Sequence, residues 1–169
     1  NSGGTITAGI VFAGDSAETN TSLWDGSNYS NGPNLNNGGY GTMGNGSQTA
    51  AFIAGSSEPP SRPNTATEEY NGFSWSEQND LNTARRYAAG FGTQTAAINA
   101  SGAAPGYSAL TEFYNGTSWT EVNDLNQARF GMGDAGTSTS SLAFGGYNGP
   151  TTYGNTETWD GTSWTEGND

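Results

Sequence analysis

The stretch Thr111–Arg129, TEFYNGTSWTEVNDLNQAR, decides the fold because the chain repeats it. Thr67–Arg85 reads TEEYNGFSWSEQNDLNTAR and matches it at 14 of 19 positions. A third copy, TETWDGTSWTEGND, begins at Thr156, and a diverged copy covers Thr21–Asn36. A repeat of this length is one supersecondary unit that buries its apolar face by stacking on its neighbours. The aligned aromatic residues lie 46, 44 and 45 residues apart, at Trp24, Tyr70, Tyr114 and Trp159.

Each repeat predicts four short antiparallel strands. Thr111–Tyr114 and Ser118–Val122 are short alternating runs rich in Thr and aromatic residues. Asn115-Gly116 lies between them and predicts a hairpin with a primed turn, which needs positive φ at its central residues. Ser140–Phe144 and Arg129–Gly133 supply the other two strands. Four strands in each repeat predict an all-β fold built from propeller blades of about 45 residues.

The repeat divides the chain into one partial and three complete blades within a single propeller or propeller arc, 1–169. Gly4–Gly14 aligns without gaps on Gly136–Gly146, so the first blade, 1–34, is expected to lack its first strand. The complete blades are expected at 35–80, 81–124 and 125–169. A ring made from these residues alone would have a gap at its inner wall. We therefore expect an arc of a larger propeller, completed by further blades from the same or another chain.

Composition excludes several classes of partner. The formal net charge is −12, and the four basic residues are all Arg. Such a chain repels phosphate, so neither nucleic acid nor an anionic membrane surface is an expected partner. The chain has no Cys, which excludes disulfides and thiolate metal sites. No apolar run approaches the roughly 18 residues that a membrane span needs.

The repeat resembles the kelch repeat. In that family a strand ends on a Gly doublet, and a variable loop, an aromatic strand, a tight turn and a Trp follow. Here Gly145-Gly146 is the doublet, Trp159 the aromatic residue and Trp164 the tryptophan. The elements YNGTSWTE, NDLN and AR are similar to kelch-like arrays in bacterial and phage surface proteins. The resemblance implies a β-propeller, and it implies an extracellular or virion-surface location.

The recurring residues are interpreted as structural. The repeated Trp should pack between neighbouring blades, with a ligand platform as the alternative. The repeated Gly should adopt positive φ in turns. The repeated Arg should pair with the recurring Glu77, Glu121 and Glu166, and an anion site is the alternative. These structural residues are Trp75, Trp119, Trp164, Gly72, Gly116, Gly161, Arg85 and Arg129.

No catalytic residue, metal ligand or cofactor is predicted. The copper radical oxidases among kelch-like propellers use Tyr, Cys and His, and this chain has neither Cys nor His. The turn at Thr158–Trp164 differs from the Asp box S-x-D-x-G-x-x-W of sialidases, because Asp160 and Gly161 are adjacent. The acidic residues recur once per blade, whereas a catalytic pair of a glycoside hydrolase should break the repeat. Asn-Asp pairs between blades suit Ca²⁺, but local Asx turns account for them better.

The loops between second and third strands differ in every blade and lie on one face. Loops on a rigid scaffold often carry recognition, with neutral variation as the alternative. We expect a non-catalytic module that binds cell-surface glycan or protein through this face. A purely architectural spacer or decoration in a fibre, capsid or surface layer is the alternative, and a glycoside hydrolase is the less favoured one. The candidate ligand-binding residues are Tyr107, Tyr147, Asn148 and Tyr153.

Overall fold

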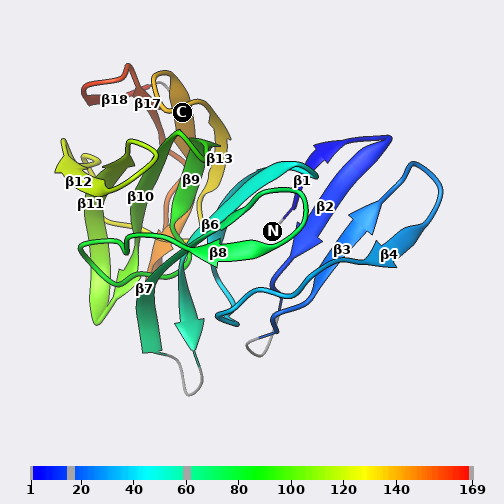
Figure 1. The fold of residues 1–169 in the computed structure, drawn as a ribbon. Coiled ribbons are helices and arrows are strands. Elements are labelled where there is room, and N and C mark those ends of the chain that lie inside the picture. Colours follow the sequence, from blue (N-terminus) through cyan, green and yellow to red (C-terminus); the bar gives the residue numbers. More distant parts are fainter. Residues whose placement is uncertain (1, 15–17, 59–61, 168–169) are drawn as a thin grey trace.

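The computed structural model describes residues 2–14, 18–58 and 62–167, which form antiparallel β-sheets and contain no helix (Figure 1). Four sheets have four strands each, in chain order, and a two-stranded hairpin accompanies the fourth sheet. The all-β class and the four-stranded antiparallel sheets predicted from the repeat are confirmed. No helix in the described part of the chain could span a membrane.

The sheets follow the repeats of the sequence. The first contains β1 (Ser2–Thr5), β2 (Ala8–Phe12), β3 (Thr21–Trp24) and β4 (Tyr29–Asn31). The second contains β5 (Met43–Ser47), β6 (Ala50–Glu58), β7 (Arg62–Tyr70) and β8 (Trp75–Glu77). The third contains β9 (Ala89–Thr93), β10 (Ala96–Ala104), β11 (Gly106–Tyr114) and β12 (Trp119–Val122). The fourth contains β13 (Gly133–Gly136), β14 (Ser141–Phe144), β17 (Thr156–Trp159) and β18 (Trp164–Glu166), beside the hairpin β15 (Tyr147–Asn148) and β16 (Thr151–Thr152).

The first strand of each sheet lies later in the repeat than predicted. The fourth sheet begins with β13 at Gly133–Gly136, not with Arg129–Gly133. Gly131 has a φ of +63°, and Phe130 makes only an isolated bridge to Tyr147, so that stretch is not an extended strand. The same shift makes Ser2–Thr5 the first strand of the first sheet. The expectation of a partial first blade that lacks this strand is therefore wrong.

The core lies between consecutive sheets. The Trp75 indole packs on Phe12 of the preceding sheet, with ring centroids 5.1 Å apart, and its Nε1–H donates to Thr21 Oγ1 at 3.0 Å. The equivalent indoles repeat this bond to the sheet before them: Trp119 donates to Thr67 at 3.0 Å and Trp164 to Thr111 at 3.2 Å. Each Trp thus joins two sheets through apolar contact and one buried hydrogen bond.

The turns between third and fourth strands contain four residues. Tyr114 pairs with Trp119, so Asn115–Ser118 form the turn. Gly116 has a φ of +88°, as its position predicted, but Asn115 does not have positive φ. Its Oδ1 instead accepts the N–H groups of Thr117 and Ser118, both at 2.9 Å. The predicted two-residue primed turn is therefore replaced by an Asx turn, which satisfies these N–H groups without a strained Asn. The equivalent glycines of the second and fourth sheets, Gly72 and Gly161, have φ of +93° and +95°.

The first strands β1, β5, β9 and β13 lie next to one another in chain order. The sheets therefore follow one another sideways, from β1–β4 at the right of Figure 1 to β17 and β18 at the upper left. No sheet formed by the described residues combines strands from both ends of the chain.

Candidate binding surface

The hairpins that join second to third strands project on one side of the molecule. The β6–β7 and β10–β11 hairpins point to the bottom of Figure 1. Both are longer than predicted, because each continues past an irregularity in the pairing, between Ala54 and Ser56 and between Ala100 and Gly102. Gly55 and Ser101 at these bulges have φ of +62° and +64°. The strand pairs therefore continue past these bulges as longer hairpins. In the third sheet, Pro105 and Tyr107 lie at the end of the hairpin.

Five aromatic rings form a continuous cluster at this side, which we call the aromatic row. The Tyr107 and Phe130 rings are stacked, with centroids 5.2 Å apart and 4° between their planes. The Phe130 centroid lies 3.9 Å from that of Tyr147 and 6.0 Å from that of Tyr87. The Tyr87 ring in turn lies 6.3 Å from Tyr40. Residues from three consecutive sheets or their connections thus form one surface.

The repeat explains how these rings meet. Tyr40, Arg86 and Phe130 occupy the same position, at which the backbone bridges to Ser57, Ala103 and Tyr147, respectively. At the next position Gly41 and Gly131 have φ of +62° and +63°, and Tyr87 adopts the same conformation with a φ of +54°. A Cβ at Gly41 would lie 2.5 Å from the Tyr87 ring, and one at Gly131 would lie 2.9 Å from the Tyr147 ring. The two glycines therefore permit rings of neighbouring segments to lie directly on the backbone.

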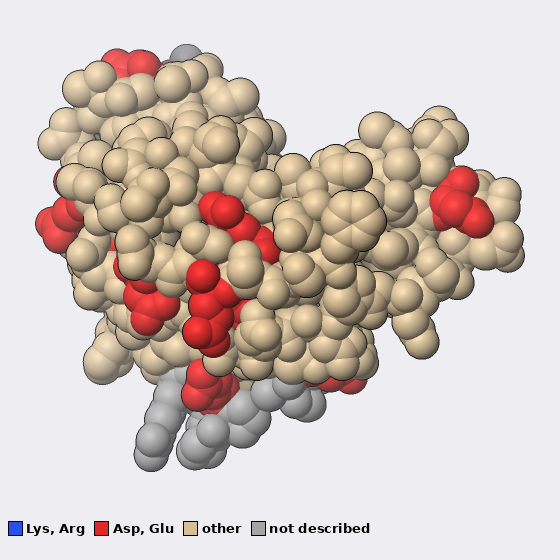
Figure 2. All heavy atoms as spheres, in the orientation of Figure 1, with Lys and Arg blue, Asp and Glu red and all other residues tan. Residues whose placement is uncertain are grey.

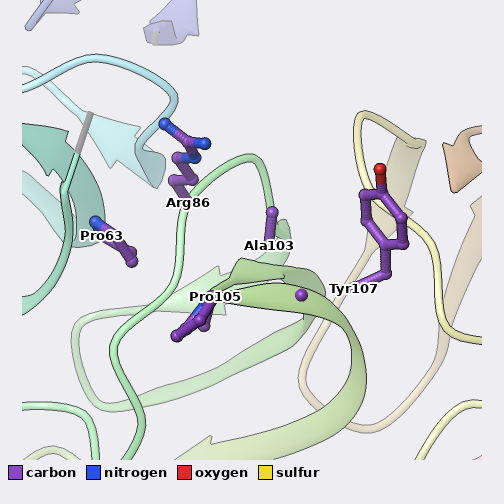
Figure 3. Close-up of a pocket in the computed structure, with 7 residues that line it drawn as sticks. Pro63, Arg86, Ala103, Pro105 and Tyr107 are labelled. Carbon is purple, nitrogen blue, oxygen red and sulfur yellow. The ribbon is translucent and has the colours of Figure 1, made fainter. Parts of the chain in front are cut away.

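A surface pocket of about 320 Å³ lies beside the aromatic row. Figure 3 shows Pro63 and Arg86 on one side of it, Pro105 at its base and Tyr107 across from them. Arg86 Nη1 donates to Ser57 Oγ at 3.1 Å, and the guanidinium carbon lies 5.6 Å from the centre of the Tyr87 ring. The lining residues are Pro63, Arg86, Ala103, Ala104, Pro105, Gly106 and Tyr107.

The structure brings together two of the four predicted ligand-binding residues. Tyr107 and Tyr147 both contact Phe130, although they come from different sheets. Asn148 lies in β15 and pairs with Thr151, outside the ring contacts. Tyr153 donates its backbone N–H to Gly146 and also makes no ring contact with the aromatic row.

Sequence reasoning missed Tyr40, Arg86, Tyr87 and Phe130. Tyr40 and Phe130 fell within predicted first strands, at 39–44 and 129–133, and Arg86 and Tyr87 lay in a stretch without a predicted role. The signal that could have found them is their place in the repeat. They lie one or two residues after Gly39, Arg85 or Arg129. At these positions the repeats align without insertions, but the residue type differs from one repeat to the next.

Every charged side chain that is visible in Figure 2 is acidic. Arg85 and Arg129 are buried and form salt bridges with Glu112 at 2.6 Å and Glu157 at 3.0 Å. The predicted partners Glu77, Glu121 and Glu166 are exposed and make neither contact. Glu112 lies directly opposite Glu121, and Glu157 opposite Glu166, but on third strands, where the side chains are buried, whereas the fourth strands carry exposed carboxylates. Burial lowers the pKa of Arg85, and the attraction of Glu112 opposes this shift.

The described residues contain no group of three or more His, Cys, Asp or Glu that could hold a metal ion. The aromatic row and its pocket have one basic residue and no carboxylate among the residues named above. Their chemistry is therefore that of stacking, apolar contact and hydrogen bonding from phenol and guanidinium groups.

No protein-family model matches the chain, and no curated protein matches its sequence.

Proposed function

We propose that this chain is a non-catalytic recognition module that binds a cell-surface glycan or protein through the aromatic row. The observation that carries the proposal is the convergence of Tyr87, Tyr107, Phe130 and Tyr147 on one side of a rigid β scaffold. Three of these side chains remain partly exposed to solvent, by 36% (Tyr87), 48% (Tyr107) and 42% (Tyr147), rather than packing into the apolar core. Amphipathic rings held in fixed positions suit both sugar faces and protein partners.

Backbone strain supports a functional role for Tyr87. A non-glycine residue with a φ of +54° is unfavourable, and the equivalent positions of two other repeats carry Gly instead. Strained residues of this kind cost about 1–3 kcal/mol and cluster at ligand sites. Retaining Tyr at this position places a ring between Tyr40 and Phe130, which Gly could not do.

A binding experiment can test this role for the aromatic row. The isolated chain should give a saturable signal on a glycan array or on intact cells. Tyr107→Ala and Tyr147→Ala should each weaken binding by about tenfold, the equivalent of a lost stacking contact of 1–2 kcal/mol. Tyr153→Ala is the matched control within the same loops, and Phe73→Ala removes an exposed ring from a β7–β8 turn. Equal losses in all four variants, or no binding to any surface ligand, would contradict the proposal.

We also propose that the four sheets are blades of a kelch-like β-propeller located at a cell or virion surface. Support comes from the adjacent first strands and from the indole that joins each sheet to the one before it. Tyr29 holds the position of these indoles in the first sheet and is 64% exposed, whereas the three Trp are 5–6% exposed. A further blade, from the same or another chain, would cover this face.

An architectural spacer or decoration in a fibre, capsid or surface layer is the second candidate function. The same exposed face favours it, because Ile6 and Tyr29 would join neighbouring units in an assembly. A purely architectural module would tolerate replacement of Tyr107 and Tyr147 without loss of assembly. Electron microscopy of the assembled particle with these two variants distinguishes the candidates.

A further inference from the structure

Glu68 of β7 is a buried carboxylate that has no cationic partner within the described part of the chain. Its side chain is 1% exposed. Oε2 accepts the backbone N–H of Asn36 at 2.8 Å and its Nδ2–H at 2.9 Å, and Oε1 accepts the N–H of Asn37 at 2.6 Å. No salt bridge joins Glu68 to any residue that the structure describes. Burying a charge without compensation is costly, so this carboxylate calls for a positive partner.

The equivalent carboxylates of the next two sheets have such a partner. Oε1 of Glu112 lies 2.6 Å from Nη2 of Arg85, and Oε1 of Glu157 lies 3.0 Å from Nη2 of Arg129. In the second sheet the residue at the arginine position is Gly39. Oε1 of Glu68 therefore keeps the acceptor position that a guanidinium occupies in the other two sheets.

A small hollow lies where that guanidinium would be. It offers about 10 Å³ to the centre of a water-sized sphere, close to the minimum for a single water or an ion of similar size. Asn64 Oδ1 is buried and has no hydrogen-bond partner among the residues that the structure describes. The residues that line the hollow are Asn37, Ile53, Gly55, Ser56, Asn64, Ala66 and Glu68.

The backbone around the hollow also corresponds to that of the arginine sites. In the third sheet Nη1 of Arg85 donates to the carbonyl oxygens of Ser101 at 3.4 Å and Leu110 at 2.6 Å. The residues at these two positions in the second sheet are Gly55 and Ala66, which both line the hollow. Their carbonyl oxygens are therefore the counterparts of two oxygens that contact a cation elsewhere in the same chain.

We propose that this hollow binds a monovalent metal cation of about the size of Na⁺. Glu68 Oε1, Asn64 Oδ1 and the carbonyl oxygens of Gly55 and Ala66 are its ligands, an all-oxygen set that suits hard cations. A single positive charge neutralises the single carboxylate, as the guanidinium does in the other two sheets. A divalent ion would leave a net positive charge buried beside Ile53.

Thermal unfolding of the full chain tests this site. Melting temperatures are compared in NaCl and in choline chloride of equal concentration, which keeps ionic strength constant while choline is too large to enter. A Na⁺ concentration ten times its Kd should raise Tm by about 3–6 °C over choline. Glu68→Gln and Asn64→Ala should abolish or weaken this difference, and the exposed carboxylate variant Glu18→Gln should retain it. Equal melts in the two salts, or an undiminished Na⁺ response in Glu68→Gln, would overturn the proposal.

A variant that restores the arginine provides a second, independent test of the cation site. A Cβ on Gly39 would lie 2.3 Å from Ser56 Oγ, so Gly39→Arg is combined with Ser56→Gly. The guanidinium should replace the ion, and this double variant should melt at the same temperature in NaCl and choline chloride. A Na⁺ response that persists in it would place the ion elsewhere. A response to millimolar CaCl₂ that exceeds that to NaCl and depends on Glu68 would overturn the monovalent assignment.

Discussion

Among single residues, the buried salt bridges show how the repeat can use charge within its core. Arg129 and Glu157 are both 0% exposed, and Nη1 of Arg129 also donates to the carbonyl oxygens of Gly145 and Asn155 at 3.1 and 2.8 Å. One side chain thereby joins the end of β14 to the start of β17. The pair fixes the relative position of these two strands more than it adds to stability, because the cost of burying two charges offsets much of their attraction.

Arg129→Met should lower the free energy of unfolding by about 3–5 kcal/mol, because it leaves Glu157 buried without its partner. Urea unfolding measures the loss. Arg129→Met/Glu157→Met should recover part of it, since neither residue is then charged. A double variant that is less stable than Arg129→Met would show that Glu157 acts independently of the arginine.

Gly116→Val should destabilise the third sheet by about 1–3 kcal/mol, because it forces a β-branched residue into a φ of +88°. The added Cβ would also lie 3.2 Å from Thr95 Cα. Thr117→Ala is the control: Thr117 is exposed, and its N–H bond to Asn115 is made by the backbone. Thermal melts of the two variants should differ clearly, and equal melts would contradict this view of the turn.

Among elements, second to fourth strands could be predicted from sequence and first strands could not. The second to fourth strands combine alternation with aromatic and β-branched residues, and turn residues bound them. The first strand GDAG at Gly133–Gly136 has no such signal and forms because β14 and the neighbouring β9 flank it. The preceding segment, RFGMG, resembles a strand more closely in composition. It is not one, because Arg129 points into the core and Gly131, with its positive φ, turns the chain.

The candidate site, like the strands, could be predicted only in part from the sequence. Loop variability pointed to Tyr107 and Tyr147, since loops on a scaffold tolerate change. Phe130, which joins their rings, lies in the connection between two sheets, and only packing reveals that this connection faces the same side. Long-range packing of this kind has no local sequence pattern.

The turns between third and fourth strands predict a pH dependence that differs between sheets. Asp160 Oδ1 accepts the N–H groups of Ser163 and Thr162, and these bonds hold the pKa of Asp160 below its ordinary value of 3.8. A carboxyl with a depressed folded pKa stabilises above its unfolded pKa, and this contribution is lost as pH falls through the folded value. The fourth-sheet turn should therefore weaken in acid, below about pH 4.

Asp160→Asn should reduce the acid sensitivity of Tm between about pH 5 and pH 2, because the amide accepts the same bonds without titrating. The third-sheet turn supplies the reciprocal control, since Asn115 makes these bonds already. Asn115→Asp should increase the acid sensitivity. Parallel curves for both variants and the wild type would show that neither turn carries the effect.

In the whole molecule, the exposed face of the first sheet is the part that a further propeller blade would have to cover. Gln48 of the second sheet donates to the carbonyl oxygens of Gly9 and Trp24 in the first, both at 2.7 Å, and Gln94 repeats this between the third and second sheets. Ile6 holds the same position in the first sheet and is 91% exposed. Ile6 and Tyr29 therefore face the side on which an earlier blade would lie.

Adding a blade tests this arrangement directly. Because Gly4 aligns with Gly136, Asn1 aligns with Gly133, and a copy of residues 81–132 placed before Asn1 continues the repeat in register. The added sheet should cover Tyr29. Tyr29→Ala should then lower the free energy of unfolding by about 1–2 kcal/mol more in the extended chain than in the original, since the ring is buried only there. Phe73→Ala, at a turn residue that is 87% exposed, should cost the same in both chains. If Tyr29→Ala also costs the same in both, the added sheet does not pack on the first, and the face serves another partner.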